Sequence, residues 1–161
     1  MSHVSDKLRQ KIVEKAQNRC GYCLGEQRYI FAPLEIDHIL PTAMGGTNVE
    51  ENLWLTCRFC NSYKGAKTHG TDSLTRRKVL LFNPRKQNWK RHFAINNGIV
   101  IVGKTTVGRA TVSALRMNNR SCHSSEELAD CGLVSAKRLW QKIMRGLIEL
   151  TAALEFGTPE Q

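Results

Sequence analysis

The sequence predicts an α+β fold built on a strand, a loop, a second strand and a helix, with cysteine pairs flanking this core. Three observations support the prediction. Apolar residues within 32–40 and 53–56 indicate two short strands, and a helix is expected to begin near Arg58. Two C-x-x-C pairs stand at the borders of these elements. Patterns beyond residue 92 add a β-hairpin and C-terminal helices.

The first half of the chain supplies the core elements in order. Residues 5–17 predict a helix capped by the serine at their start, because apolar side chains repeat on one face at four-residue spacing. The first strand, 32–40, leads into a loop with the Gly45-Gly46 pair, which permits backbone angles that other residues avoid. The second strand, 53–56, is followed by a helix expected to end between residues 65 and 67.

The second half predicts a different architecture. Residues 74–87 are basic and rich in loop-forming residues, and Asn96-Asn97-Gly98 indicates a hairpin turn. Residues 106–117 predict a helix, and an apolar stripe from Trp140 to Leu154 predicts a longer amphipathic one. We therefore divide the chain into 1–70, a core with its cysteine pairs, and 71–161, a basic linker with a β-hairpin and a helical extension.

The cysteines fall into two groups. Cys20-x-x-Cys23 and Cys57-x-x-Cys60 have identical spacing, as expected of two knuckles that share one tetrahedral zinc ion. A thioredoxin-like redox role is less favoured, because there are two such pairs and neither lies in a βαβ context. Cys122 and Cys131 follow no ligand spacing, and we interpret them as core residues.

Positive charge is concentrated in the middle of the chain. Residues 1–57 contain six Lys/Arg and seven Asp/Glu, whereas residues 58–91 contain ten Lys/Arg and one acid. Residues 92–161 contain eight Lys/Arg and six acids. Such a basic block favours a polyanionic partner, above all nucleic acid, through release of counterions. A solvated basic surface without a partner is the alternative.

No stretch of the sequence approaches the 18 apolar residues that a transmembrane helix needs, so no membrane span is expected. The first fifteen residues contain no apolar segment typical of a signal peptide. We therefore expect a cytoplasmic protein, where structural zinc is more common than disulfide bonds.

Polar residues that can do chemistry stand at the ends of the core elements. They are Asp37-His38, Pro41, Gly45-Gly46, Asn52, the run Cys57-x-x-Cys60-Asn61, and Lys64. With these residues the segment from Cys20 to Lys67 resembles the cysteine-bearing branch of the HNH endonucleases, which have a ββα-metal core. The later motifs Phe82-Asn-Pro-Arg, Trp89, His92-Phe93, Gly108-Arg-Ala-Thr111 and Ala136-x-x-Leu-Trp140 are similar to an extension that recurs in bacterial HNH proteins.

The resemblance implies a role for each matching residue. His38 is the general base that takes a proton from the attacking water, a task suited to an imidazole with a pKa of about 6.5. Asp37 and Asn61 are the ligands of a catalytic cation, and Asn52 holds the backbone that orients His38. Asn61 stands where the family name has its last His. A carboxylate with an amide oxygen favours Mg²⁺ or Mn²⁺, so two metals are expected: a catalytic Mg²⁺ or Mn²⁺ and a structural Zn²⁺.

The implied reaction is hydrolysis of a DNA phosphodiester that leaves a 5′-phosphate and a 3′-hydroxyl, with one strand cut at each site. Glu35 shares a strand face with Asp37 and is expected to support the metal ligands. Trp89 either stacks on a base or, as we favour, anchors the hairpin. Basic residues are expected to contact DNA phosphates regardless of sequence: Lys64, Lys67, Arg76, Arg77, Lys78, Arg85, Lys86, Lys90 and Arg91.

Two alternatives stay open at this point. The chain could be a zinc-stabilised module that binds nucleic acid without cutting it. It could also be an interaction protein whose C-terminal helix contacts a second copy of the chain or another protein.

Overall fold

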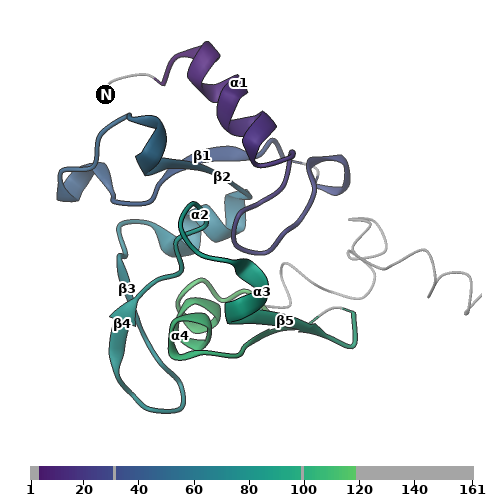
Figure 1. Cartoon of the computed structure of the whole chain (residues 1–161), viewed down its shortest axis with the longest axis vertical. Coiled ribbons are helices and arrows are strands. Elements are labelled where there is room, and N and C mark those ends of the chain that lie inside the picture. The colour runs from purple at the N-terminus through teal and green to yellow at the C-terminus, as the bar shows by residue number, and fades with distance from the viewer. Residues whose placement is uncertain (1–3, 31, 99, 119–161) are drawn as a thin grey trace, which may run out of the picture.

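The computed structural model describes residues 4–30, 32–98 and 100–118. Figure 1 shows a succession of short elements with α1 at one end of the molecule and the β3–β4 hairpin at the other. The elements, in chain order, are α1 (Asp6–Lys15), β1 (Glu35–His38), β2 (Leu53–Thr56), α2 (Arg58–Lys64), β3 (His69–Thr71), β4 (Lys78–Leu80), α3 (Trp89–His92), β5 (Phe93–Asn96), β6 (Val100–Gly103) and α4 (Thr106–Ala114). Short 3₁₀ turns cover Gln27–Tyr29, Thr42–Met44 and Glu50–Asn52.

The core of the fold is the β1–loop–β2–α2 unit. β1 and β2 pair antiparallel, with Asp37 opposite Trp54 and His38 opposite Leu53. Helix α2 begins directly after β2, where Cys57 caps it by accepting a hydrogen bond from the backbone N–H of Cys60. Because Thr56 at the end of β2 pairs with Glu35, α2 begins beside the start of β1, and its last residue, Lys64, reaches the end of β1. The expected α+β architecture and ββα core are confirmed.

Helix α1 packs against β2 through its apolar face. Ile12 is fully buried and Leu8 is half-buried against the same core. The serine at position 5 caps the helix by accepting a hydrogen bond from the N–H of Leu8 at 3.3 Å, as predicted. α1 thereby closes the core on the side away from the β3–β4 hairpin (Figure 1).

The segment after α2 contains one more hairpin than the sequence predicts. β3 and β4 pair antiparallel within a region that we expected to be a loop-rich linker. Each of these strands has three residues, too few for an alternating pattern to be recognised. Contacts with α4 position them instead. The hairpin around Asn96-Asn97-Gly98 is confirmed as β5 and β6.

Buried residues from both sides of residue 70 belong to one hydrophobic cluster, which includes Tyr22 and Leu55 as well as Phe82 and Phe93. A hydrogen bond from Trp89 Nε1 to the backbone oxygen of Tyr22, at 2.7 Å, joins the extension to the first cysteine pair. Trp89 thus has the position of an anchor between the extension and the first cysteine pair. The division of the chain into two parts at residue 70 stays a prediction.

The extension motifs form the interior of the second half. The hydroxyl of Thr111 accepts a hydrogen bond from the N–H of Phe82 and donates one to the oxygen of Val107. Gly108 lies against His92, because a Cβ there would stand 2.1 Å from the backbone oxygen of His92. These contacts fix α4 against β4 and α3. The predicted C-terminal helices, Cys122 and Cys131 lie outside the described residues.

None of the helices in the described part of the chain combines the length and hydrophobicity needed to cross a membrane.

Candidate functional site

The predicted base and the two predicted ligands of the catalytic cation line one pocket. Asp37, His38 and Asn61 lie around a cavity of about 280 Å³ between the end of β1 and the C-terminal half of α2, together with Pro41–Ala43 and Gly65-Ala66. Neighbours in a regular strand point to opposite faces. His38 is the last residue of β1, where the regular alternation of the strand ends. Its side chain therefore lines the same pocket as that of Asp37.

A side chain from the following loop holds the ring of His38. Its Nε2 lies 2.7 Å from Oδ1 of Asn48. A carboxamide oxygen only accepts hydrogen bonds, so this contact places the ring proton on Nε2 and leaves the lone pair on Nδ1. His38 is thus held with one nitrogen available as a base.

Asn52 braces the backbone of the same loop. Its Oδ1 accepts from the N–H of Leu40 at 2.8 Å, and its Nδ2 donates to the oxygens of Leu40 and Thr47, both at 3.0 Å. Gly46 allows this close packing, because a Cβ at that position would stand 1.8 Å from the oxygen of Leu40. The loop that follows His38 is therefore tied to the start of β2.

Asp37 is buried in a polar network. Only 4% of the residue is exposed, and its carboxylate accepts from Lys64 Nζ at 2.9 Å and from the Tyr22 hydroxyl at 3.3 Å. Lys64 Nζ also donates to the backbone oxygen of His38 at 2.6 Å. Burial raises the pKa of Asp37, while Lys64 and Tyr22 act in the opposite direction. Burial, and then the charge of Asp37, raises the pKa of Tyr22 well above its usual range, so its hydroxyl remains a donor.

Asn61 reaches the pocket from α2, where Glu35 orients its side chain. Asn61 Nδ2 donates to Glu35 Oε2 at 2.5 Å. This bond uses the amino group of the amide, so the amide oxygen is the atom available to a cation. Glu35 therefore contacts a candidate metal ligand, which is the supporting position expected for it.

The donor set fits a hard divalent cation. A carboxylate has about four lone-pair positions, and Asp37 uses two of them for Lys64 and Tyr22. The amide oxygen of Asn61 borders the same cavity, whose volume leaves room for water ligands. Mg²⁺ binds to proteins through one or two such oxygens and keeps several waters.

The four cysteines of the two C-x-x-C pairs are positioned to bind zinc. The sulfur atoms of Cys20, Cys23, Cys57 and Cys60 all lie within 4.8 Å of one another. A tetrahedral site with Zn–S bonds of about 2.3 Å has S···S edges of roughly 3.8 Å. The sulfurs of Cys23 and Cys57 are 3.8 Å apart, which matches this geometry.

The cysteine cluster is connected to the pocket through residues that stand next to the cysteines in the chain. Tyr22, which donates to Asp37, stands between Cys20 and Cys23. Asn61 directly follows Cys60 in α2. The N–H of Gly21 donates to the oxygen of Leu55, which ties the first knuckle to β2. A metal in the cysteine cluster would thus hold both sides of the pocket.

Two residues that we expected to contact DNA phosphates, Lys64 and Arg85, are not exposed. Lys64 is 2% exposed and its ammonium is bonded to Asp37 and His38, so it is an internal counter-ion rather than a surface cation. Arg85 is half-buried: its Nε donates to the oxygen of Leu53 and its guanidinium lies over the ring of Trp54. Both side chains are occupied within the fold.

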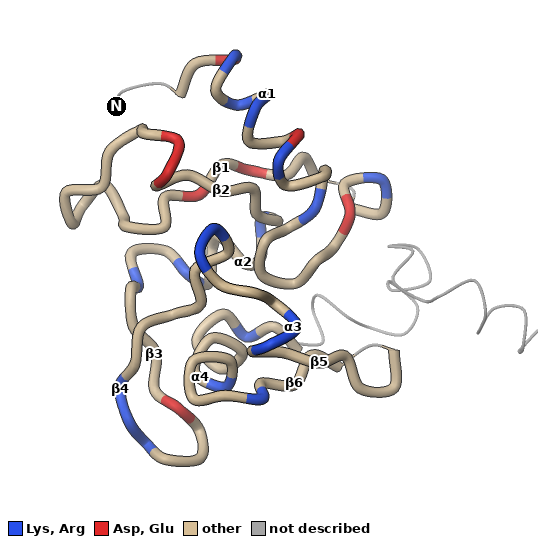
Figure 2. The backbone as a smooth tube through the Cα atoms, viewed as in Figure 1, with Lys and Arg blue, Asp and Glu red and all other residues tan. Residues whose placement is uncertain are grey.

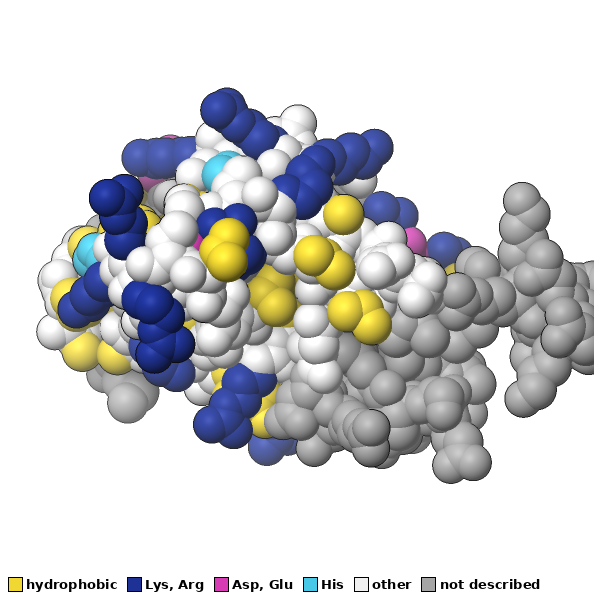
Figure 3. Space-filling view, turned by 90° about the horizontal axis from the view of Figure 1, so that it is seen from below, with side chains coloured by type: hydrophobic (Ala, Val, Ile, Leu, Met, Phe, Trp, Pro, Cys, Tyr) yellow, Lys and Arg dark blue, Asp and Glu magenta, His cyan; other side chains and the backbone are white. Residues whose placement is uncertain are grey.

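The other predicted phosphate contacts are exposed. Figure 2 shows the acidic positions mainly around α1, β1 and β2, whereas the part with β3 to β6 and α4 is marked mainly by Lys and Arg. On the face seen in Figure 3, Lys and Arg side chains far outnumber Asp and Glu side chains. The exposed members of the predicted set are Lys67, Arg76, Arg77, Lys78, Lys86, Lys90 and Arg91.

Sequence reasoning missed two residues that contact the site. Tyr22 was considered only as part of the first knuckle, although its hydroxyl reaches Asp37. Asn48 belongs to no motif of the sequence, but its side chain contacts His38. Its place as a polar residue in the loop between His38 and Asn52 is the signal that could have identified it.

Comparisons with known proteins gave a match to one protein family. No curated protein and no solved structure matches the chain. The family model described as HNH endonuclease matches residues 20–67, the segment that holds the two cysteine pairs, both strands of the core and α2. Residues 20–67 of this chain are therefore similar to the HNH endonuclease family.

Proposed function

We propose that this protein is a metal-dependent DNA endonuclease in which His38 activates water and Asp37 and Asn61 hold the catalytic cation. The observation that carries the proposal is the shared pocket of these three side chains, with the Nδ1 lone pair of His38 left available by the contact of Nε2 with Asn48. The match of residues 20–67 to the HNH family supports a nuclease chemistry.

In the proposed reaction, His38 takes a proton at Nδ1 from the water that attacks phosphorus. Asn48 accepts from Nε2–H and stabilises the charged imidazolium that forms. Bound Mg²⁺ or Mn²⁺ would neutralise charge on the phosphoryl oxygens and on the departing 3′ oxygen. Attack in line with that oxygen breaks its bond to phosphorus and leaves a 5′-phosphate, and the departing 3′ oxygen takes a proton from water to become a 3′-hydroxyl.

The remaining polar residues position these groups. Asn52 holds the loop after His38, and Glu35 turns the amide oxygen of Asn61 toward the cation. Lys64 and Tyr22 fix the carboxylate of Asp37 from two sides. Such preorganisation is how a site lowers a reaction barrier without moving during the reaction.

The exposed basic residues favour a nucleic acid as the substrate. Seven of the predicted phosphate contacts are exposed, and the one acid among residues 52–118, Asp72, is buried. A surface of this kind binds phosphates without reading sequence, and its affinity falls steeply with salt.

One observation favours the alternative of a module that binds nucleic acid without cutting it. Both oxygens of Asp37 already accept hydrogen bonds, one of them from the ammonium of Lys64. A positive charge so close to a metal ligand opposes a second cation. The nuclease is favoured because the orientation of His38 by Asn48 has no use in a binding module.

Incubation of supercoiled plasmid with the purified protein and Mg²⁺ or Mn²⁺ tests the proposal. We expect nicked circles that are absent with EDTA and absent for His38→Ala. Gln10→Ala is the control, because Gln10 is exposed in α1 and does not line the pocket.

Equal nicking by wild type and His38→Ala would overturn the role of His38 and indicate a contaminating nuclease. DNA binding without cutting, in both metals and on duplex and single-stranded DNA, would support the binding module instead.

A further inference from the structure

The β3–β4 hairpin lies outside the HNH segment and presents an exposed tip with cations and apolar side chains. Arg76, Arg77 and Lys78 are exposed. Leu74 is 74% exposed and Leu80 is 62% exposed, the two highest values among the large hydrophobic side chains described as exposed. In Figure 1 this hairpin projects from the end of the molecule opposite α1.

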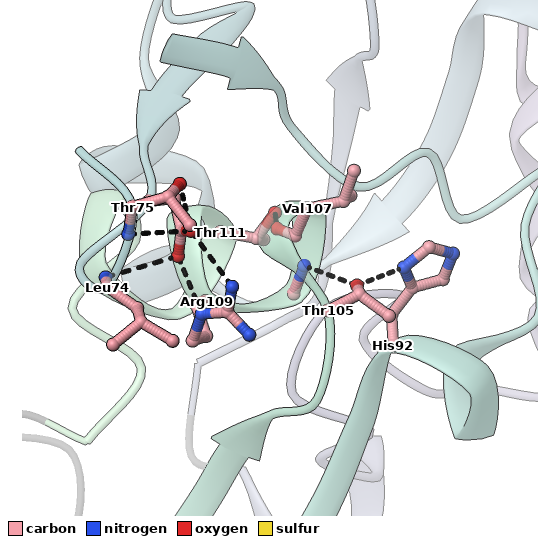
Figure 4. A network of polar contacts seen from close by, with 9 residues as sticks. Leu74, Thr75, His92, Thr105, Val107, Arg109 and Thr111 are labelled. Atoms are coloured by element: carbon pink, nitrogen blue, oxygen red, sulfur yellow. Dashed lines mark hydrogen bonds and ion pairs between the residues drawn. The ribbon is translucent and has the colours of Figure 1, made fainter. Parts of the chain in front are cut away.

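A buried carboxylate fixes the conformation of this tip. Asp72 is fully buried, and its oxygens accept hydrogen bonds from the N–H groups of Leu74 and Thr75 and from the Thr75 hydroxyl. The backbone N–H of Asp72 donates to the oxygen of Arg77 at 2.8 Å, and its backbone oxygen accepts from Arg76 at 2.9 Å. The turn is thus closed from inside (Figure 4).

Arg109 connects this turn to the rest of the fold. Its Nε and Nη2 donate to the two oxygens of Asp72 at 2.6 and 2.9 Å, a bidentate ion pair. Arg109 belongs to α4, the helix that also packs on β3 and β4. The guanidinium of Arg109, and then the Thr75 hydrogen bonds, hold the pKa of Asp72 far below its usual range.

The ion pair also decides the charge that the tip presents. Asp72 is the one acid among residues 52–118, and it is buried and neutralised by Arg109. The exposed cations of the hairpin therefore have no acidic neighbour in the loop. The fixed turn thus exposes leucine and arginine side chains together.

We infer that the β3–β4 hairpin is an arm that enters a groove of duplex DNA, with Arg76, Arg77 and Lys78 on phosphates and Leu74 against the bases. A two-stranded ribbon fits a DNA groove, and apolar side chains can wedge between base steps. The inference rests on the proposed function for its substrate and adds a preference for duplex. Asp72 and Arg109 are positioning residues for this arm.

Binding is measured separately from cutting, in the full-length His38→Ala protein without divalent cations. Fluorescence anisotropy with a labelled duplex and its single strand, over a range of salt concentrations, gives the slope of log affinity against log salt. Arg76→Ala/Arg77→Ala should lower that slope by about 2 for duplex and weaken binding on the order of 10- to 100-fold at about 0.1 M salt. Lys7→Ala/Arg28→Ala removes the same charge near α1 and should change the slope little.

Two further variants separate a shaped arm from simple attraction of charge. Asp72→Asn raises the net charge by one, so charge alone predicts equal or tighter binding. A positioned arm predicts several-fold weaker duplex binding, because the turn loses its ion pair. Leu74→Ser keeps the charge, and it should weaken binding to duplex but not to single strand.

The outcomes are distinct. An unchanged slope for Arg76→Ala/Arg77→Ala, or equal or tighter duplex binding by Asp72→Asn with an unchanged melting temperature, would overturn the arm. If Asp72→Asn does not fold, the binding of the Arg76→Ala/Arg77→Ala and Leu74→Ser variants decides whether the arm exists. A reduced slope in a protein that cuts no DNA in any metal would support the arm and overturn the endonuclease.

Discussion

At the residue scale, the proposed role of His38 as the base depends on its hydrogen bond to a side chain of the following loop. Asn48 Oδ1 meets His38 Nε2 at 2.7 Å and so selects the tautomer with its lone pair on Nδ1. Without this acceptor the ring can rotate or exchange tautomers, and the fraction of protein with a correctly placed base falls.

We therefore expect Asn48→Ala to reduce the rate of plasmid nicking by roughly 10- to 100-fold, the range found for partners that orient metal-site ligands. Asn48→Asp keeps an acceptor at the same place and should retain more activity than Asn48→Ala. Single-turnover nicking rates at saturating protein provide the measurement. Wild-type rates in Asn48→Ala would show that the contact does not orient the base.

A second residue-scale prediction concerns the buried pair of Lys64 and Asp37. The two side chains are 2% and 5% exposed, so removal of one partner leaves the other charge buried without its counter-ion. Lys64→Met should lower the free energy of unfolding by about 3–5 kcal/mol.

Urea denaturation of Lys64→Met, Asp37→Asn and the double variant checks this expectation. The double variant should be more stable than the sum of the two single effects predicts, because it contains no unpaired charge. Strictly additive effects would contradict a direct coupling between the two groups.

At the element scale, the cysteine cluster joins α2 to the first knuckle. Cys57 and Cys60 lie in the first turn of α2, and Tyr22 in the knuckle donates to Asp37. Loss of the metal would therefore displace Tyr22 and Asn61 from the pocket as well as destabilise the fold.

We expect one zinc ion per chain by elemental analysis, and a lower melting temperature with loss of nicking after removal of zinc by a strong chelator. Nicking should return when Zn²⁺ is restored together with Mg²⁺, but not with Mg²⁺ alone. Full recovery with Mg²⁺ alone would show that the cysteine cluster does not support the pocket.

Another element-scale prediction concerns acid stability. Glu50 pairs with Lys11 and Lys15 of α1, and hydrogen bonds from these two lysines lower its pKa to about 2. A carboxylate whose pKa is lowered by folding stabilises the protein above its unfolded pKa, and this contribution is lost as the pH falls. Stability should therefore decline between about pH 5 and pH 2.

Melting temperatures of wild type and Glu50→Gln across that range test the assignment. Glu50→Gln should be less stable at neutral pH and should show a weaker pH dependence, whereas the exposed neighbour variant Glu51→Gln should follow wild type. Parallel curves for wild type and Glu50→Gln would contradict the assignment.

At the scale of the whole molecule, the described halves share one hydrophobic cluster and a hydrogen bond from Trp89 to Tyr22. Trp89→Phe keeps an aromatic ring and removes the donor. It should lower the free energy of unfolding by about 0.5–1.5 kcal/mol. If the halves are one cooperative unit, the whole transition shifts and far-UV circular dichroism and fluorescence coincide. Separate transitions would indicate two domains.

Local patterns in the sequence were enough to predict several of the elements. The spacing of the cysteines, the apolar run 53–56, the serine before α1 and the turn at residues 96–98 each predicted the structure that is observed. Such features depend on residues a few positions apart, and their chemistry can be recognised in a single chain. Asp37, His38 and Asn61 were candidates because the motifs that contain them resemble those of the HNH endonucleases.

Only the tertiary structure decided which of these residues meet and which charges are available. Lys64 reaches Asp37 from 27 residues away, Tyr22 from 15, and Arg109 reaches Asp72 from 37. A lysine in the sequence has the same chemistry whether it is buried or exposed, and strands of three residues have no recognisable period. Contacts between distant segments depend on how the elements pack, because packing decides which polar groups leave water and must find partners within the fold.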